Sequence, residues 1–276
     1  MIAGFLIDIE FVWGFQARVV GLSKTSPSFS YPPPTTFLGA LAESISKGLG
    51  LGESSGRVVM AELAKNLLAI GLKPINCRPI KYADVSRIIA IKVTSGQLHP
   101  TPMNLAGSFD SPARGKTMLQ SLDGGSPVIR WFLVFKDDGI IIGGRSLMLE
   151  NDVWRIHRLG SKESIVSILD VKRLKRLDVK TNDERVKTSY SIPLNLVRSV
   201  DPGQMEGKWV VEQYLDPFDE RSFEKPVEDY LKETTRFMLP ICEYAHSDYY
   251  ARVEPIKHAK AYFCGEEVVI GRGHKG

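Results

Sequence analysis

Apolar and polar positions alternate at the start of the chain and predict a β-strand over residues 4–20. Within this stretch Asp8 and Glu10 lie on one face. Successive side chains of a strand point to opposite faces, so the wholly apolar set should face the core. Arg18 falls in the continuing strand, from which its side chain could project to a surface. The predicted core-facing residues are Phe5, Ile7, Ile9, Phe11 and Trp13.

Farther along the chain, the spacing of the apolar residues changes to that of a helix and predicts two helices. The segment Tyr31-Pro-Pro-Pro-Thr-Thr contains three prolines, which forbid a helix before Thr35. We therefore expect Thr35 or Thr36 to cap a helix that ends near Gly48. A second helix is expected over residues 57–70. Its predicted inward residues are Val58, Leu63, Leu67 and Ile70.

Several strand signals surround one long irregular stretch. Residues 95–127 are rich in Gly, Pro and Ser, and a loop of this length within a compact domain is unusual unless it is an extended functional hairpin. We interpret it as an insertion that protrudes from a sheet. The resulting order of strand, helix, strand, insertion, strand, short element and strand is typical of a ferredoxin-like split βαβ arrangement. The expected strands here are 87–94, 128–135, 140–142, 153–159 and 164–171.

A polar stretch rich in Lys and Arg, residues 172–187, marks the predicted domain boundary. Residues 1–180 should form an α+β, ferredoxin-like domain with its insertion at about 95–127. Residues 181–276 should form a smaller, β-rich domain. Its expected strands lie near residues 190–197, 208–214, 237–244, 259–264 and 268–270.

Composition narrows the class of protein. The 276 residues carry 36 Lys and Arg against 32 Asp and Glu, a mildly basic balance that suits a polyanionic partner without requiring one. Cys77, Cys242 and Cys264 lie too far apart for a disulfide framework or a metal-ligand motif. The sequence shows neither a signal peptide nor an apolar run of about 18 residues, so we expect a cytoplasmic protein with no membrane span.

Motifs of known catalytic chemistry are absent from the sequence: there is no P-loop, no His-Glu-x-x-His and no Gly-x-Ser-x-Gly. Of the five histidines, His157 is the most suggestive, because it lies between cations in Arg155-Ile-His157-Arg158. It could act as a general base, contact a phosphate or have no role in function.

Three segments have features of a nucleic-acid interface, each with a plainer interpretation beside it. The amides at a helix start and the hydroxyls of Thr35 and Thr36 can bind an anion, with Tyr31 stacked on a base, or they can simply begin a helix. The turn Arg158-Leu-Gly-Ser-Lys162 can form an anion-binding nest or an ordinary hairpin turn. Cations and an apolar wedge in the insertion can separate bases, or the insertion can be a surface loop. The residues concerned there are Arg114, Lys116 and Met118.

At Tyr31-Pro-Pro-Pro-Thr-Thr-Phe-Leu-Gly-Ala-Leu the sequence resembles the repeat-associated (RAMP) family numbered five among the CRISPR-associated proteins, a subunit of the type I complex Cascade. The stretch Arg158-Leu-Gly-Ser-Lys-Glu-Ser-Ile-Val is similar to that family's glycine turn and following strand. The insertion before Val128 matches the position of the family's thumb. The resemblance covers roughly the first 170 residues, and the length and C-terminal part look most like the archaeal type I-A version.

This resemblance implies a ferredoxin-like (RRM-like) domain with a long β-hairpin thumb and a smaller β-rich domain. It implies a non-catalytic subunit, without cofactor or metal, that caps the 5′ handle of the guide RNA (crRNA) in antiviral defence. The backbone RAMP subunit and the large subunit would be its protein partners, and target DNA would meet it only through the guide heteroduplex. The implied RNA-binding positions are Arg18, Tyr31, Thr35, Thr36, Gly39, Lys92, Arg114, Lys116, Met118, His157, Arg158 and Lys162.

Two other functions remain open from the sequence. One branch of the resembled family cleaves repeat RNA without a metal, and Tyr31, Lys116 and His157 could fill such acid–base roles. A protein-only scaffold could instead use exposed aromatic side chains at its interfaces. The predicted strands lack the aromatic signature of RNA-recognition sheets, so base stacking on the sheet is not expected. The candidate interface aromatics are Trp209, Tyr249 and Tyr250.

Overall fold

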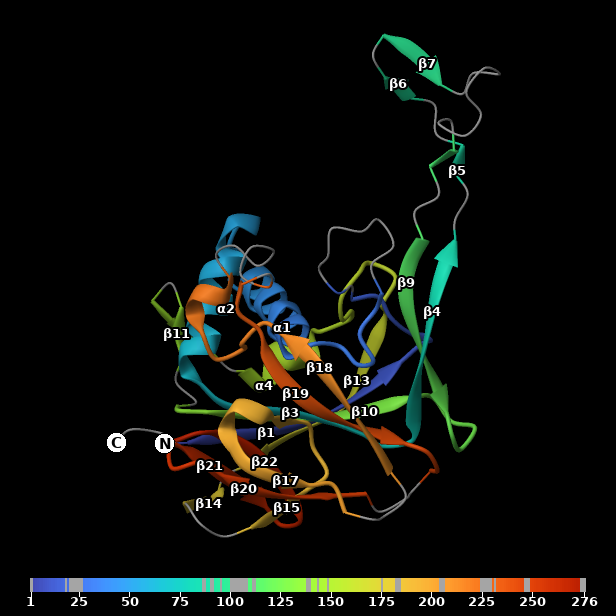
Figure 1. The fold of residues 1–276 in the computed structure, drawn as a ribbon. Helices are drawn as coiled ribbons and strands as arrows, with labels where there is room; N and C mark the ends of the chain where they lie inside the picture. The colour runs from blue at the N-terminus through green and yellow to red at the C-terminus, as the bar shows by residue number, and fades with distance from the viewer. Residues whose placement is uncertain are drawn as a thin grey trace.

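An antiparallel sheet of seven strands, in the order β13-β1-β10-β3-β22-β21-β14, is the frame of this mixed α/β molecule (Figure 1). The strands are β13 (Val166–Leu174), β1 (Ala3–Phe11), β10 (Val128–Phe135), β3 (Leu67–Pro74), β22 (Glu267–Arg272), β21 (Ala259–Cys264) and β14 (Asp178–Thr181). The computed structural model describes residues 2–273 except 18, 20–26, 86–87, 90–91, 95, 100–108, 111–112, 138–139, 143, 148, 175, 182–184, 204–206, 224–229, 231 and 246–248.

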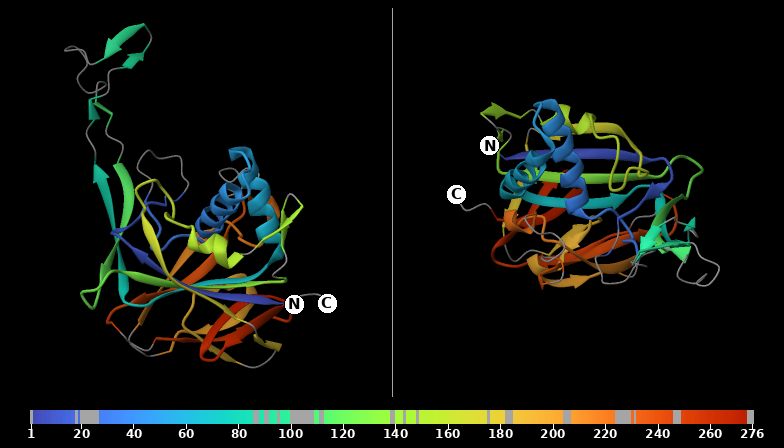
Figure 2. Two further views of the ribbon diagram at one scale, coloured as in Figure 1. Left: turned by 180° about the vertical axis from the view of Figure 1, so that it is seen from behind. Right: turned by 90° about the horizontal axis from the view of Figure 1, so that it is seen from above.

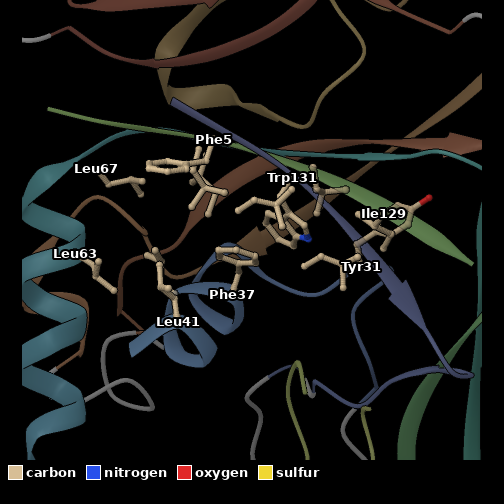
Figure 3. Packing of buried hydrophobic residues seen from close by; sticks show 14 of the residues in the cluster. Phe5, Tyr31, Phe37, Leu41, Leu63, Leu67, Ile129 and Trp131 are labelled. Atoms are coloured by element: carbon tan, nitrogen blue, oxygen red, sulfur yellow. The ribbon is translucent and has the colours of Figure 1, made fainter. Parts of the chain in front are cut away.

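The apolar face of β1 meets the helices, as its alternation predicts. Phe5, Ile7 and Ile9 are each at most 3% exposed, and Figure 2 shows helices lying across this face of the sheet. In the core of Figure 3, the ring of Phe37 lies 4.9 Å from that of Trp131, which joins the first helix to β10. The helices are α1 (Pro34–Gly48), α2 (Gly56–Asn66) and α4 (Leu149–Trp154).

Helix α1 begins at Pro34, earlier than a cap at Thr35 or Thr36 would allow, and its cap differs from the prediction. Pro33 is the N-cap residue and no side chain caps the helix, so the threonine cap is wrong. The backbone amides of Thr36 and Phe37 donate to the carbonyl oxygen of Pro33 instead. Proline suits the first helical position, because its missing N–H has no intrahelical partner there anyway.

Helix α2 ends at Asn66, and the residues expected to continue it form strand β3. An apolar run such as 67–74 fits a buried helix or a buried strand equally well by periodicity alone. Pairing with β10 decides the matter, because it supplies cross-strand partners along the whole length of β3. One residue of the predicted inward set is also wrong: Val58 is 62% exposed and Val59 is buried in its place, whereas Leu63 is buried as predicted.

One predicted strand is wrong, and another lies outside the main sheet. Residues 149–154 form α4, and the segment after it turns instead of extending. Residues 87–94 lie outside the main sheet and contain only the short strands β5 (Ile88–Ile89) and β6 (Lys92–Thr94) in their described part.

The insertion is a hairpin that projects from the body, with wider bounds than predicted (Figure 1). Its stem pairs β4 (Cys77–Val85) with β9 (Ala113–Ser121) residue for residue, and β2 (Gly14–Phe15) joins β9 near its base. Farther out, β5 pairs with β8 (Phe109–Asp110), and β6 with β7 (Gln97–His99).

Strands from both sides of the predicted boundary near residue 180 contribute to the seven-stranded sheet, while the division into two domains stays a prediction. Two three-stranded sheets complete the second part. They comprise β15 (Val186–Thr188), β20 (Ala251–Pro255) and β17 (Val197–Asp201), and β16 (Ile192–Pro193), β19 (Thr235–Cys242) and β18 (Gly207–Tyr214). The remaining short elements are η1 (Glu53–Ser55), β11 (Ile141–Ile142), β12 (Arg145–Ser146), η2 (Leu194–Leu196) and η3 (Glu220–Phe223).

On the sheet face away from the helices, one arginine links three strands. The guanidinium of Arg130 in β10 donates to both carboxylate oxygens of Asp8 in β1, at 2.6 and 2.7 Å, and to Glu267 in β22 at 2.8 Å. Lys73 in β3 adds a 3.4 Å ion pair to Glu267. Bidentate pairs of this kind fix geometry as well as charge, so the cluster helps to hold β22 beside the first four strands.

Gly271 lies where β22 meets β3, and we predict that Gly271→Ala destabilises the fold. A Cβ at this position would lie 2.2 Å from the carbonyl oxygen of Leu68 and 2.5 Å from the Cβ of Ala69. Overpacking of this kind typically costs about 1–3 kcal/mol. Urea denaturation measures the change. Gly56→Ala is the matched control, because nothing lies within 4 Å of its added Cβ; equal stability of the two variants would contradict the prediction.

Candidate functional site

A cleft of about 260 Å³ opens at the start of helix α1. It brings together two segments that the sequence singled out separately, the Pro-Thr-Thr helix start and the glycine turn at Gly160. The second part of the chain supplies a further wall. The lining residues are Gln16, Ala17, Phe29, Pro33, Thr35, Thr36, Gly160, Tyr214, Leu215 and Tyr230.

The start of α1 gives the cleft an anion-binding end. Thr35 and Thr36 are partly exposed in the first turn, and no acidic residue lies in that turn. The positive end of the helix dipole favours an anion there, and each hydroxyl can donate a hydrogen bond. The prolines hold this turn in place, because the chain approaches it in a restricted, extended form.

The glycine turn is locked against the chain that leaves β2. Gly160 has φ +104°, and a Cβ there would lie 2.8 Å from the carbonyl oxygen of Gln16. The amide of Ser161 donates to that same oxygen at 3.3 Å, and the amide of Gln16 donates to Ser164 Oγ at 2.9 Å. Only glycine fits this position, so the turn keeps a fixed place beside the start of α1.

Aromatic rings form the opposite wall. The ring of Phe29 lies edge-on to Tyr214 at 5.0 Å and to Tyr230 at 6.4 Å. Burial, followed by the nearby Glu212 carboxylate, raises the pKa of Tyr214 well above its ordinary value, so its hydroxyl stays protonated and donates to Glu212 at 2.8 Å. Sequence reasoning missed Tyr214 and Tyr230, because no local pattern brings residues so distant in the chain to the start of α1.

Glu212, in β18, connects the three segments around the cleft. Its carboxylate accepts hydrogen bonds from the amide and the hydroxyl of Ser30, at 2.9 and 2.8 Å, and from Tyr214. It also pairs with Lys81 of the hairpin stem at 3.1 Å. The side chain is only 11% exposed, which strengthens these interactions. One carboxylate thus fixes the loop before α1, the aromatic wall and the base of the hairpin.

Tyr31 does not take the role that the sequence suggested. Its side chain is fully buried among the core residues of Figure 3, and burial raises its pKa well above the ordinary value. A base cannot stack on a ring with no exposed face, so the stacking role is a correction to the sequence interpretation. The nearby partly exposed residues of the cleft are Thr35 and Thr36 instead.

The other predicted residues of the two motifs divide between two places. Gly39 lies on α1 one turn beyond the cleft and is partly exposed, and Lys162 is exposed in the glycine turn. Arg158 pairs with Glu43 through two hydrogen bonds, and the exposed His157 lies beside it. Arg158 and His157 therefore line a separate hollow next to the cleft.

The hairpin residues are held away from the cleft lining. Met118 in β9 is 42% exposed and pairs with Ile80, and Lys116 is partly exposed. Only the backbone of Lys92 in β6 and of Arg114 in β9 is described. Arg18 lies outside the described residues. The structure thus divides the predicted contacts between the cleft, the neighbouring hollow and the hairpin.

Metal-binding side chains do not gather anywhere in the described part of the chain. In those ranges, no group of three or more His, Cys, Asp or Glu side chains is placed to hold a metal ion. Cys77, Cys242 and Cys264 take part in no disulfide, and Cys77 and Cys242 are buried. None of the helices described here combines the length and the apolar character needed to span a membrane.

Comparison with known proteins extends the similarity along the chain. No family model matches it. It is 25% identical over 267 residues to a Saccharolobus solfataricus protein named as the Cas5 1 subunit of the CRISPR system aCascade, covering 96% of this chain and 97% of that one. The crystal structure of a CRISPR protein from Archaeoglobus fulgidus is 44% identical with a TM-score of 0.71, covering 99% of this chain and 100% of that one. Both similarities include the C-terminal part, beyond the motifs noted in the sequence.

We predict that Glu212→Ala lowers stability by about 1–3 kcal/mol, because it leaves the buried hydroxyl of Tyr214 and the amide of Ser30 without their acceptor. Chemical denaturation provides the measurement. Glu254→Ala is the control: it breaks a pair with Arg198, whose side chain is 63% exposed, and such pairs contribute at most about 1 kcal/mol. A loss no larger for Glu212→Ala than for the control would show that Glu212 does not organise the cleft.

Proposed function

Because this chain belongs to the Cas5 family of CRISPR-associated proteins, we propose that it is a non-catalytic RNA-binding subunit that caps the 5′ handle of the guide RNA in a type I effector complex. The archaeal relative is named as a subunit of Cascade, which supports an archaeal, type I-A assignment. The guide RNA, the backbone RAMP subunit and the large subunit are then its partners, and target DNA reaches it only through the guide heteroduplex.

The observation that carries this proposal is the meeting of both motifs in one cleft. The start of α1 and the glycine turn offer donors for phosphate oxygens, while the partly exposed ring of Tyr230, backed by the buried rings of Phe29 and Tyr214, offers aromatic surface for a base or a sugar. None of the described lining residues is charged. Neutral hydrogen-bond donors favour a ligand whose acceptors match their positions, and they attract negative charge in general less strongly than cations do. This selectivity suits recognition of a defined RNA end.

The arrangement of the first part of the chain supports a ferredoxin-like RAMP domain. Its main elements run β1, α1 with α2, β3, β10, α4 and β13, which is a β-α-β-β-α-β order. The four strands are neighbours in one sheet, and the hairpin is inserted between β3 and β10. We assign that hairpin as the thumb, because it projects from the body where it can reach a nucleic-acid strand (Figure 1).

The alternative functions receive less support from the same residues. A ribonuclease site built from Tyr31, Lys116 and His157 would need a tyrosine that substrate can reach, and Tyr31 is fully buried. The scaffold interpretation relied on aromatic residues that already have partners within the chain: Trp209 packs against Tyr249, and Tyr250 lies under Lys187 and Arg252.

Handle recognition predicts a preference that can be measured directly. We expect the protein, alone and with the backbone subunit, to bind a guide RNA with an intact 5′ handle more tightly than one with a scrambled handle. Fluorescence anisotropy gives both dissociation constants, and a parallel incubation with repeat RNA in EDTA should yield no cleavage products. Equal affinity for the two RNAs would favour a protein-only scaffold, and a specific cut would favour the nuclease.

The cleft threonines provide a residue-level test. Thr35→Val with Thr36→Val keeps the side-chain shapes and removes two hydroxyl donors. Each lost neutral hydrogen bond costs about 0.5–1.5 kcal/mol, or about two- to twelvefold in Kd. The loss should appear with intact-handle RNA and not with scrambled RNA. Thr234→Val, at a partly exposed threonine outside the cleft lining, is the matched control and should bind as the wild type does.

The thumb assignment predicts a different signature. Arg114→Ala with Lys116→Ala should weaken guide binding about uniformly across sequences, because phosphate contacts carry no sequence information. The dependence of log K on log salt should flatten by about 0.7 for each lost contact with single-stranded RNA. Titrations at several salt concentrations measure the slope. An unchanged slope would remove these residues from the RNA path.

A further inference from the structure

A second hollow, of about 90 Å³, lies beside the cleft along the same helix. Ala40, Glu43 and Lys47 line it from the face of α1 that also carries Thr36, because residues three and four apart lie on one side of a helix. From Thr36 to Lys47 this face extends about 16 Å at the rise of an α-helix. One wall of the hollow is residues 155–158, and Gly160, two residues later, belongs to the cleft. The two hollows thus follow one another between the same helix and the same segment.

Charge distinguishes the two hollows. The cleft lining is neutral, whereas Lys47, Arg155 and Arg158 line the second hollow together with His157. Among the described residues of that lining, Glu43 is the only carboxylate. Arg155 is held by Asp152 at 3.0 Å and still has 56% of its side chain exposed. A strand that leaves the cleft along α1 would therefore meet a cluster of cations.

Glu43 occupies the centre of this cluster. Its carboxylate accepts from Arg158 Nη2 at 2.5 Å and Nε at 3.2 Å, and it pairs with Lys47 at 2.7 Å. Partial burial raises the pKa of Glu43, but the hydrogen bonds from Lys47 and Arg158 outweigh it and bring the pKa below its ordinary value. A guanidinium fork binds phosphate in the same bidentate geometry as it binds a carboxylate. Glu43 thus stands where a phosphate would bind.

We propose that this hollow is a second anion subsite, which holds a backbone phosphate of the RNA strand whose end lies in the cleft, and that Glu43 competes with that phosphate for Arg158 and Lys47. The inference rests on the proposed function, since the strand enters from the cleft. It assigns a role to Glu43, Lys47 and Arg155, residues outside the two motifs.

Competition by Glu43 makes binding selective for an anchored strand. A polyanion that is not held in the cleft binds from solution and must displace the Glu43 carboxylate from Arg158 and Lys47. Replacing one anion by another at these cations strengthens its binding little. A strand already held in the cleft presents its next phosphate at high local concentration, so the exchange becomes favourable. Glu43 therefore lowers affinity for RNA in general more than for RNA that fits the cleft.

The test is Glu43→Gln, which keeps the side-chain shape and removes the competing charge. We expect intact-handle guide RNA to bind about two- to fivefold more tightly. The affinity of a single-stranded RNA without a handle should rise further, and its salt slope should steepen by about 0.7 for each additional phosphate that the protein neutralises. Glu62→Gln is the matched control, because it makes the same change in net charge at a carboxylate that pairs with Lys65 on α2.

An equal rise in affinity for Glu43→Gln and Glu62→Gln would overturn the subsite, because the effect would then be one of net charge alone. If Glu43→Gln proves unstable in thermal unfolding, Lys47→Gln tests the same subsite with the opposite sign: weaker binding supports it, and unchanged binding overturns it. Failure of the proposed function would show in a different experiment, in which the wild-type protein binds RNAs with intact and scrambled handles equally well. That comparison does not involve Glu43.

Discussion

The close backbone contact between β22 and β3 is the constraint from which the rest of the architecture follows. At Gly271 the two strands approach so nearly that a methyl group would lie 2.2 Å from the carbonyl oxygen of Leu68. This approach joins strands from both ends of the chain into one sheet, which the Arg130 cluster then spans. The second part of the chain is thereby brought beside α1, where it supplies the aromatic wall of the cleft.

Glu212 holds together the segments that surround the cleft. It binds the loop before α1 through Ser30, the aromatic wall through Tyr214 and the hairpin stem through Lys81. A largely buried carboxylate with four such donors is costly to displace, because the Ser30 amide and the buried Tyr214 hydroxyl would be left without an acceptor. The cleft and the base of the hairpin are thus held in one relation to each other.

In the function that we propose, α1 carries separate places for recognition and for affinity. The neutral cleft is suited to one hydrogen-bonding pattern, while the cationic hollow beyond it is suited to any phosphate. A bare cationic hollow would attract every polyanion, and Glu43 counters that attraction in the free protein. The hairpin adds a third surface, which projects from the body at a distance from both.

Local patterns in the sequence were enough for the core face of β1, for the helix after the prolines, for β10 and for the two motifs at Thr35 and Gly160, because each depends on neighbours in the chain. They failed where a segment suits two structures equally: residues 67–70 suggested the end of a helix although pairing with β10 makes them a strand, and Tyr31 suggested an interface residue although the core encloses it. The meeting of the two motifs, the aromatic wall, the pairing of Glu43 with Arg158 and the contacts of Glu212 were decided by tertiary structure alone. Sequence patterns report the environment of a residue along the chain, whereas a cleft is made by segments that only the packing of the sheet brings together.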